Sequence, residues 1–501
     1  MYLLVILAFA IVLWRTDEPV LVLGFTDSNP LLTGAIVWGP PLVLSLIAWV
    51  VGNHARRRLQ RQPELPEAVQ FLHHRLLAIL RLFLLVGFAI AVLSTPWPAW
   101  FRLGRVHPAL QIVGDVVVLS PFFFGTVALW VAAYPLEREL RGLALSHGES
   151  AAATHGKMLS YLEFHIRHHL LIVTVPMLLI LFAANLTDAY EDGLRRFSRS
   201  VWGPDLALAS VAAIVFVTSP LMLVRIWKTA PLPDGPVRQR LEETCRHIQL
   251  RCRDILVWPS DGMMVNAAVM GLFAPVRYIL LSDGLLSTMT PSQIEAVFGH
   301  EAGHVRHRHI QHFLIFALAG WLVVAGAMEG MARSAQNGHV DWWTPPFIQG
   351  TGVVATLFFW GVGFGWLSRR FERQADLFGA RCVTPAADDR CVVPCSVHGG
   401  EKRGDRSDAR VCATGAAVFA SALDTVAILN GIPHEERSWR HSSIGSRIRF
   451  LSSLAGDPGR AANFERGLSR ITKEMWSLAI IGSAFWLYYG LTVPEPLILK
   501  L

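Results

Sequence analysis

The sequence has few charged residues. Only 17% of its 501 residues are Asp, Glu, Lys or Arg, whereas 52% are hydrophobic and the mean hydropathy is +0.40. Ordinary soluble domains carry about 25% charged residues. This composition excludes an ordinary soluble protein and predicts a chain that crosses a membrane several times.

Long apolar runs predict about nine membrane crossings. A transmembrane helix needs ~20 apolar residues. Runs that reach or approach this length lie at 2–14, 31–52, 82–97, 112–134, 170–186, 206–224, 313–328, 347–366 and 476–493. The first run has the length of a signal-peptide core, but it lacks a basic leader and an A-x-A-like exit before Arg15. We therefore expect a retained anchor.

Basic residues predict which loops face the cytoplasm. The second and fourth loops hold Arg56, Arg57, Arg58, Arg61, Arg75, Arg138, Arg141, Lys157 and Arg167. The positive-inside rule places these loops in the cytoplasm, and successive crossings then place residues 228–312 and 369–473 there as well. The amino terminus would be inside and the carboxyl terminus outside. The net charge of +7 would then lie mainly in cytoplasmic loops beside anionic lipid, and no nucleic-acid partner is expected.

A capped helix is predicted before the motif HEAGH at 300–304. Thr290 can cap its start, Pro291 suits its first position and Gln293 can complete a capping box. Apolar residues then recur at helical spacing. The motif is therefore expected on a regular helix.

Two histidines four residues apart lie on one face of such a helix. His300 and His304 could thus bind one Zn²⁺, with Glu301 beside the metal as a general base. The alternative is a helix whose two histidines have this spacing by chance.

A catalytic zinc usually takes three protein ligands and a water. The metzincin arrangement would need glycine at position 307 and histidine at 310, and His307 and Ile310 exclude it. Glu372 is the best candidate for the third ligand. Asp376 would share its helical face and could orient a ligating histidine. An ordinary salt-bridged helix is the alternative, because four arginines lie nearby.

More histidines follow the motif. His307 could share the face of His304, which leaves an extra metal contact open. We instead expect His307, His309 and His312 at the membrane interface, together with Arg306 and Arg308.

These motifs together resemble a known family. HEAGH, two apolar runs and then SRRFERQAD are similar to the integral-membrane zinc metallopeptidases that include the CaaX prenyl endopeptidases and the HtpX heat-shock proteases. The other similar segments are NAA at 266–268, RYILLSDGLL at 277–286 and HSSIGSR at 441–447. The resemblance covers roughly residues 235–455. Phe371 and Gln374 favour the prenyl-protease branch, whereas Ser442 replaces the family's proline.

The resemblance implies a fold and a site. The fold would be mainly α: a polytopic helical membrane protein with a zincin-like cytoplasmic metalloprotease domain containing a small β-sheet. One Zn²⁺ would be bound by His300, His304 and Glu372, with Glu301 as catalytic base and Asp376 orienting a ligand. The resemblance also places His441 and Arg447 at the active site, and Asn266, Ala267 and Ala268 at the substrate.

The expected organisation has five parts. They are an amino-terminal six-helix membrane region (1–227), the HEAGH segment (228–312), a transmembrane hairpin (313–367), a second catalytic segment (368–473) with an insertion at about 384–410, and a last transmembrane helix (474–501). The implied activity is hydrolysis of peptide bonds in membrane-associated or lipidated polypeptides. Residues 265–272 or 278–282 could supply a sheet edge for an extended peptide, or could simply support the core.

Two other functions stay open. One is a sensor or scaffold that no longer turns over, although the intact Glu301 argues against it. The other is a transporter built on the amino-terminal crossings, where Asp115 is the notable acidic residue.

Six cysteines in cytoplasmic parts predict free thiols. Cys245 and Cys252 are expected to be packing residues on a helix. The other four, in or beside the insertion, are Cys382, Cys391, Cys395 and Cys412. Cys391, Cys395 and His398 could begin a structural zinc site, with a loop of scattered thiols as the alternative.

Overall fold

The computed structural model describes most of the chain in two compact units. The described residues are 1–13, 29–61, 66–146, 157–200, 202–260, 262, 264–338, 340, 343–383, 411, 413–430, 432–436, 438–455 and 458–492. The first unit comprises residues 1–229 and 258–263, and the second comprises residues 230–257 and 264–501.

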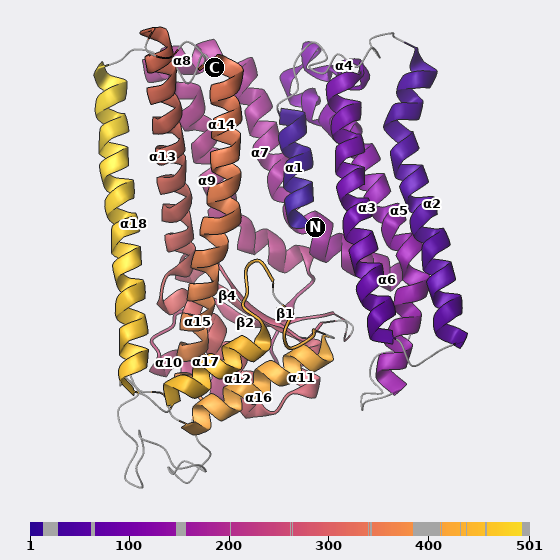
Figure 1. The fold of residues 1–501 in the computed structure, drawn as a ribbon, viewed down its shortest axis with the longest axis vertical. Helices are drawn as coiled ribbons and strands as arrows, with labels where there is room; N and C mark the ends of the chain where they lie inside the picture. Colours follow the sequence, from indigo (N-terminus) through magenta and orange to yellow (C-terminus); the bar gives the residue numbers. More distant parts are fainter. Residues whose placement is uncertain are drawn as a thin grey trace. The chain divides into compact units, whose positions relative to one another are not determined.

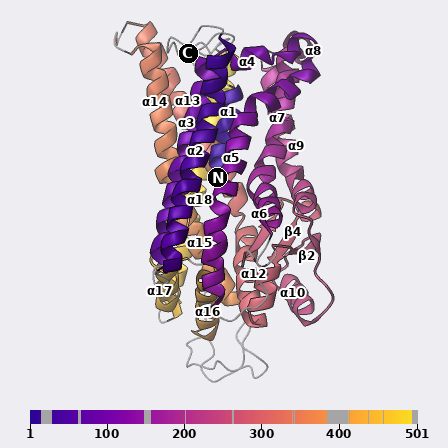
Figure 2. The same cartoon turned by 90° about the vertical axis from the view of Figure 1, so that its right-hand side faces the viewer.

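The first unit is built from helices (Figure 1). They are α1 (Tyr2–Leu13), α2 (Pro30–Arg61), α3 (Pro66–Ser94), α4 (Trp97–Trp100), α5 (Gln111–Ser146), α6 (Met158–His165), α7 (Ile172–Ala189), α8 (Glu191–Ser198) and α9 (Gly203–Ile226). A π-helical turn, Ile166–Leu171, joins α6 to α7. Helices α2, α3 and α5 pack together, and α7 runs beside α9 (Figure 2).

Asp115 lies inside the first unit and not in contact with water. The side chain is fully buried. Its two oxygens accept hydrogen bonds from Gln111 Nε2 at 2.8 Å and from Asn185 Nδ2 at 2.6 Å. These bonds link α5 to α7. A buried carboxylate needs such partners, because leaving its lone pairs unsatisfied is costly. Asp115 therefore serves to join helices.

The second unit combines a four-stranded sheet with helices. The strands β1 (Ala230–Pro231), β2 (Asp254–Trp258), β3 (Ala267–Met270) and β4 (Tyr278–Ser282) have the order β1-β2-β4-β3. β3 pairs antiparallel with β4, with Ala267 opposite Leu281 and Met270 opposite Tyr278. All five residues of β4 are buried, whereas β3 is the terminal strand of this sheet.

Some helices of this unit carry the candidate site residues, and others are long and apolar. They are α10 (Pro236–His247), α11 (Asp283–Thr288), α12 (Pro291–Arg306), α13 (His309–Gln336), α14 (Pro345–Phe358), α15 (Gly365–Cys382), α16 (Ala413–Leu429), α17 (Ile444–Ala455) and α18 (Pro458–Thr492). A π-helical turn, Phe359–Phe364, continues α14 into α15. Within the unit, α13, α14 and α18 extend away from the sheet (Figure 1).

Seven described segments are long and apolar enough to cross a membrane. They are Pro30–Arg61, Val69–Ser94, Pro108–Leu140, Met158–Ala189, Gly203–Ile226, His309–Gln336 and Pro345–Cys382. They correspond to seven of the nine predicted runs, although the run at 82–97 extends three residues beyond Ser94. The first run forms α1, whose 12 residues span only about 18 Å of a hydrocarbon layer about 30 Å thick. The ninth run, 476–493, lies in α18 and ends one residue beyond Thr492, the last described residue.

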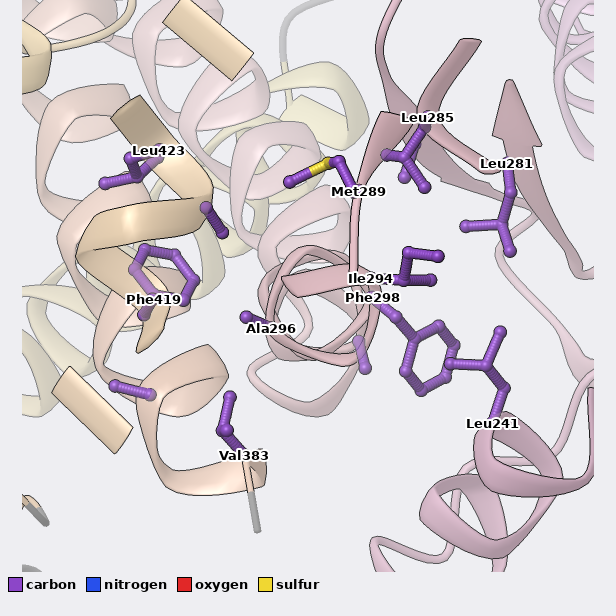
Figure 3. Packing of buried hydrophobic residues seen from close by; sticks show 14 of the residues in the cluster. Leu241, Leu281, Leu285, Met289, Ile294, Ala296, Phe298, Val383, Phe419 and Leu423 are labelled. Carbon is purple, nitrogen blue, oxygen red and sulfur yellow. The ribbon is translucent and has the colours of Figure 1, made fainter. Parts of the chain in front are cut away.

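Helix α12 lies at the centre of the second unit's core. Phe298 and Ile294 point toward Leu241 of α10 and Leu281 of β4, while Ala296 lies on the side of Phe419 of α16 (Figure 3). Fully burying a large apolar side chain contributes roughly 1.5–3 kcal/mol. This packing fixes the helix that carries HEAGH on both of its buried sides.

Candidate metal centre

The predicted start of α12 is confirmed. The Thr290 side chain accepts a hydrogen bond from the Gln293 backbone N–H, and the Gln293 side chain accepts one from the backbone N–H of Thr290. Pro291 occupies the first position. With its first turn satisfied in this way, the helix runs unbroken through His300 and His304.

Small residues let α15 approach α12 closely. A Cβ atom at Gly379 would lie 2.9 Å from the backbone nitrogen of His300, and one at Gly299 would lie 2.8 Å from the Cβ of Cys382. Cβ atoms are essentially never found this close to another heavy atom, so larger residues would push the two helices apart. The close approach brings Glu372, on α15, to the face of α12 that carries the histidines.

Three donor groups meet at this point. Among the described residues, the group of His, Cys, Asp or Glu side chains able to hold one metal ion is His300, His304 and Glu372, with ligand atoms within 4.8 Å of one another. The Nε2 atoms of the histidines are 3.3 Å apart, and they lie 3.5 and 3.8 Å from the Glu372 oxygens. Two nitrogens bound to a tetrahedral zinc at about 2.0–2.1 Å are about 3.3–3.4 Å apart, so the donors fit zinc.

Asp376 and Arg447 lie directly behind these donors. His300 Nδ1 is 2.9 Å from Asp376 Oδ1, as expected for a carboxylate that orients a ligating histidine. Arg447 donates from Nε to Asp376 Oδ2 at 2.9 Å and from Nη2 to Oδ1. Burial disfavours the guanidinium charge, but Asp376 and Glu372 outweigh that cost and raise the pKa of Arg447.

The two histidines differ in protonation. Burial favours a neutral His300, yet contacts with Asp376 and Glu372 prevail and raise its pKa to about 10. Burial and the nearby His300 charge lower the pKa of His304 to about 3. Without a metal, a proton on His300 thus balances the two carboxylates, and a metal ion must displace it.

Glu301 is directed toward the edge of the sheet. Its Oε2 accepts a hydrogen bond of 3.3 Å from the backbone N–H of Val269 in β3. Burial raises the pKa of Glu301 to about 7, against the opposing effect of protonated His300. General bases work best with a pKa near the operating pH.

The remaining predicted residues lie around this centre. His441 is 46% exposed, and its Nδ1 is 3.0 Å from Glu372 Oε2. Ala267 and Ala268 lie in β3, and Asn266 precedes that strand. Of the two segments proposed as a sheet edge, β3 has the terminal position and β4 is interior.

Two features near the site were missed by the sequence reasoning. Asn430 holds the backbone of Val265, two residues before β3. Its side chain accepts a hydrogen bond from Val265 N at 3.2 Å and donates one to Val265 O at 2.9 Å. His309, expected at the membrane interface, is 1% exposed, and its Nδ1 lies 2.8 Å from Nδ1 of His304. His307 is partly buried as well, and burial lowers its pKa to about 4.

The three cysteines in the described part of the chain do not belong to the metal group. Cys245 and Cys252 are free thiols, and Cys245 and Cys382 are buried. Cys391, Cys395, His398 and Cys412 lie outside the described residues, so the suggested structural zinc site stays a prediction.

Residues 231–431 match the model of peptidase family M48. This match covers the sheet, α12 and α15 and ends before His441 and Arg447. The chain contains a peptidase family M48 domain. Its three convergent donors and Glu301 all lie within that domain.

Two known proteases are similar to part of this chain. A "Protease HtpX homolog" of Thermoplasma acidophilum is 30% identical over 115 residues, which are 22% of this chain and 36% of that protein. The "CAAX prenyl protease 1 homolog" of Arabidopsis thaliana is 25% identical over 197 residues, 36% of this chain and 46% of the relative. The chain thus spans less than half the length of these two relatives. The crystal structure of S. mikatae Ste24p is similar over 85% of this chain and all of that chain, with a TM-score of 0.47 and 14% identity.

Proposed function

We propose that the protein is a membrane-embedded zinc metalloendopeptidase that cleaves membrane-associated polypeptides. The observation that carries this proposal is the convergence of His300, His304 and Glu372 with spacings that suit tetrahedral zinc, beside a glutamate hydrogen-bonded to the terminal strand of the sheet. The match to a peptidase family supports the same reaction class. Catalysis would take place on the cytoplasmic side, as the distribution of basic residues predicts.

Glu301 is the general base of the proposed reaction. A zinc ion bound by the three donors would polarise the scissile carbonyl and lower the pKa of its water to about 7. Glu301, adjacent to His300, would accept a proton from the attacking water and later deliver it to the leaving amine. In the metal-free protein, burial raises the pKa of Glu301 to about 7, near the operating pH that suits a general base.

His441 and Arg447 contribute differently. Arg447 is buried and makes two hydrogen bonds to Asp376, so its role is to hold the two carboxylates in place. His441 is half exposed beside Glu372 and is free to meet substrate. We therefore assign to His441 the stabilisation of negative charge on the carbonyl oxygen during attack.

The edge of β3 binds the substrate backbone. An extended peptide pairs with a terminal strand through main-chain hydrogen bonds, which expose one amide at a time. β3 ends this sheet, and the Val269 N–H already contacts the catalytic glutamate. A peptide paired along 266–270 would thus place an amide bond beside Glu301.

The test is a comparison of three forms of the full-length protein in lipid nanodiscs: the parent, Glu301→Gln, and Glu243→Gln on the exposed face of α10 as a matched control. Bound zinc is measured, and cleavage is followed on an unstructured membrane-tethered peptide with and without a prenyl group. We expect all three to retain zinc and only Glu301→Gln to lose cleavage, by roughly 10²–10⁴-fold. Equal cleavage by Glu301→Gln and the parent would contradict the assigned base. A zinc-loaded parent that cleaves neither peptide would favour a catalytically silent scaffold.

A further inference from the structure

The ring nitrogen of His304 that faces away from the donor group has a partner of its own. His304 Nδ1 lies 2.8 Å from His309 Nδ1, and His309 Nε2 lies 2.9 Å from Gln374 Oε1. These three side chains form a continuous chain, which we name the His304–His309–Gln374 chain. It runs from α12 through the first residue of α13 to α15.

A break between helices makes this chain possible. On one unbroken helix, residues five apart do not share a face. Here α12 ends at Arg306, and Arg308 adopts a left-handed conformation with φ of 55° before α13 begins at His309. A non-glycine residue in this conformation is uncommon and is sustained by surrounding structure. The break turns His309 back toward His304.

Packing holds the His309 ring in one orientation. The ring stacks on Phe371 with centroids 4.3 Å apart and an interplanar angle of 3°, and only 1% of the residue is exposed. Phe371 precedes Glu372 on α15. The residue that stacks on His309 is thus adjacent in sequence to a proposed metal ligand.

The chain has a direction. The Gln374 carbonyl oxygen is an acceptor, so His309 Nε2 carries the hydrogen and His309 Nδ1 has a free lone pair. That lone pair accepts from His304 Nδ1–H, which leaves the lone pair on His304 Nε2, the atom that faces His300 and Glu372. The reverse direction would put the hydrogen on His304 Nε2 and prevent it from binding a metal.

We propose that His309 and Gln374 are positioning residues that hold His304 in the tautomer able to bind zinc. The inference rests on the proposed metal site and assigns it a second support. His300 is oriented by the carboxylate of Asp376, whereas His304 is oriented by a neutral chain that ends in an amide. The neutral support adds no further negative charge to a site that already has two carboxylates.

Three substitutions in the full-length protein test the chain. His309→Phe keeps a ring against Phe371 but removes both nitrogens. Gln374→Met keeps the length of the side chain and removes the acceptor. Gln374→Glu keeps an oxygen acceptor and therefore the direction of the chain. Zinc affinity is measured by competition with a chelator, and the double variant His309→Phe/Gln374→Met is included.

The expected pattern is specific to a hydrogen-bond chain. His309→Phe and Gln374→Met should each weaken zinc binding by roughly 10–100-fold, and Gln374→Glu should stay close to the parent. The double variant should be no weaker than His309→Phe alone, because the chain is already broken at its first link.

The proposal would be overturned by zinc affinity within twofold of the parent in His309→Phe, by equal losses in Gln374→Met and Gln374→Glu, or by losses that add in the double variant. Each of these results would mean that His309 and Gln374 act through packing alone and not through a hydrogen-bond chain. A parent that binds no zinc would overturn the metal site together with this inference. A zinc-binding parent with unaffected variants would overturn this inference alone.

Discussion

Buried polar groups are used in opposite ways in the two units. In the first unit, the carboxylate of Asp115 is divided between donors on two helices, Gln111 and Asn185, and so joins them. In the second unit, the carboxylates of Glu372 and Asp376 share one helical face and meet two histidines and an arginine. The first arrangement links two helices, and the second concentrates charge where a metal ion can balance it.

Removing a ligand should produce the largest effect. Glu372→Ala leaves two histidines and should weaken zinc binding by roughly 10³-fold, because the binding energy of a zinc site is shared among its ligands. Competition with a chelator measures the affinity, and peptide cleavage should fall with it. If Glu372→Ala keeps full zinc occupancy and activity, another residue is the third ligand.

The charge concentrated in the second unit should also make zinc binding depend on pH. His300 has a pKa of about 10 in the metal-free protein, so at neutral pH it is protonated and zinc must displace that proton. His304, with a pKa of about 3, is already neutral. Apparent zinc affinity should therefore rise about tenfold per pH unit from pH 6.5 to 8.5.

This dependence can be checked by chelator competition at three pH values. A flat profile would show that His300 is neutral before zinc binds, and that the carboxylates do not hold a proton there.

Disturbing the close packing of α15 on α12 should have the next largest effect, on both stability and zinc binding. Gly379→Ala would place a Cβ 2.5 Å from Phe419 Cε2 and 2.9 Å from the His300 nitrogen, and should cost about 1–3 kcal/mol. We expect a lower melting temperature and weaker zinc binding. Gly193→Ala on exposed α8 has open space around its Cβ and should be neutral or stabilising by up to about 1 kcal/mol. Equal behaviour of the two variants would contradict the proposed close packing.

Loss of the Asp115 carboxylate should leave the metal site unchanged. Asp115→Ala removes the acceptor for Gln111 and Asn185, which costs about 1–3 kcal/mol for each unsatisfied donor. The melting temperature in detergent should fall relative to the control Asp192→Ala on exposed α8, while zinc affinity stays at the parent value. A parallel loss of zinc would show that the two units are not independent in this respect.

Local rules predict the parts of the site that lie on single helices. The capping box at Thr290 and the helical spacing of His300 and His304 depend only on neighbours in sequence, and the structure confirms that helix. The Glu372–Asp376 spacing works in the same way on α15. The contact between α15 and α12, however, was predicted only from the family resemblance, since no local rule reports which helices will touch.

His309 could not be found by periodicity. Its contact with His304 requires α12 to end and Arg308 to take a positive φ, and helical spacing would place a residue five positions away on another face. Asn430 was missed for a related reason, since it contacts Val265 across 165 residues of sequence. Among the described residues, seven segments are long and apolar enough to cross a membrane where nine runs were predicted, and the first run forms a helix of only 12 residues.

The central claim is that one zinc ion is bound by two imidazoles and a carboxylate in the M48 domain. Zinc K-edge X-ray absorption on the full-length protein, with one zinc per chain, tests it most directly. The spectrum should show nitrogen and oxygen neighbours at about 2.0–2.2 Å, an imidazole scattering pattern from two histidines, and no sulfur. A sulfur neighbour at about 2.3 Å would place the zinc on cysteines and contradict the account.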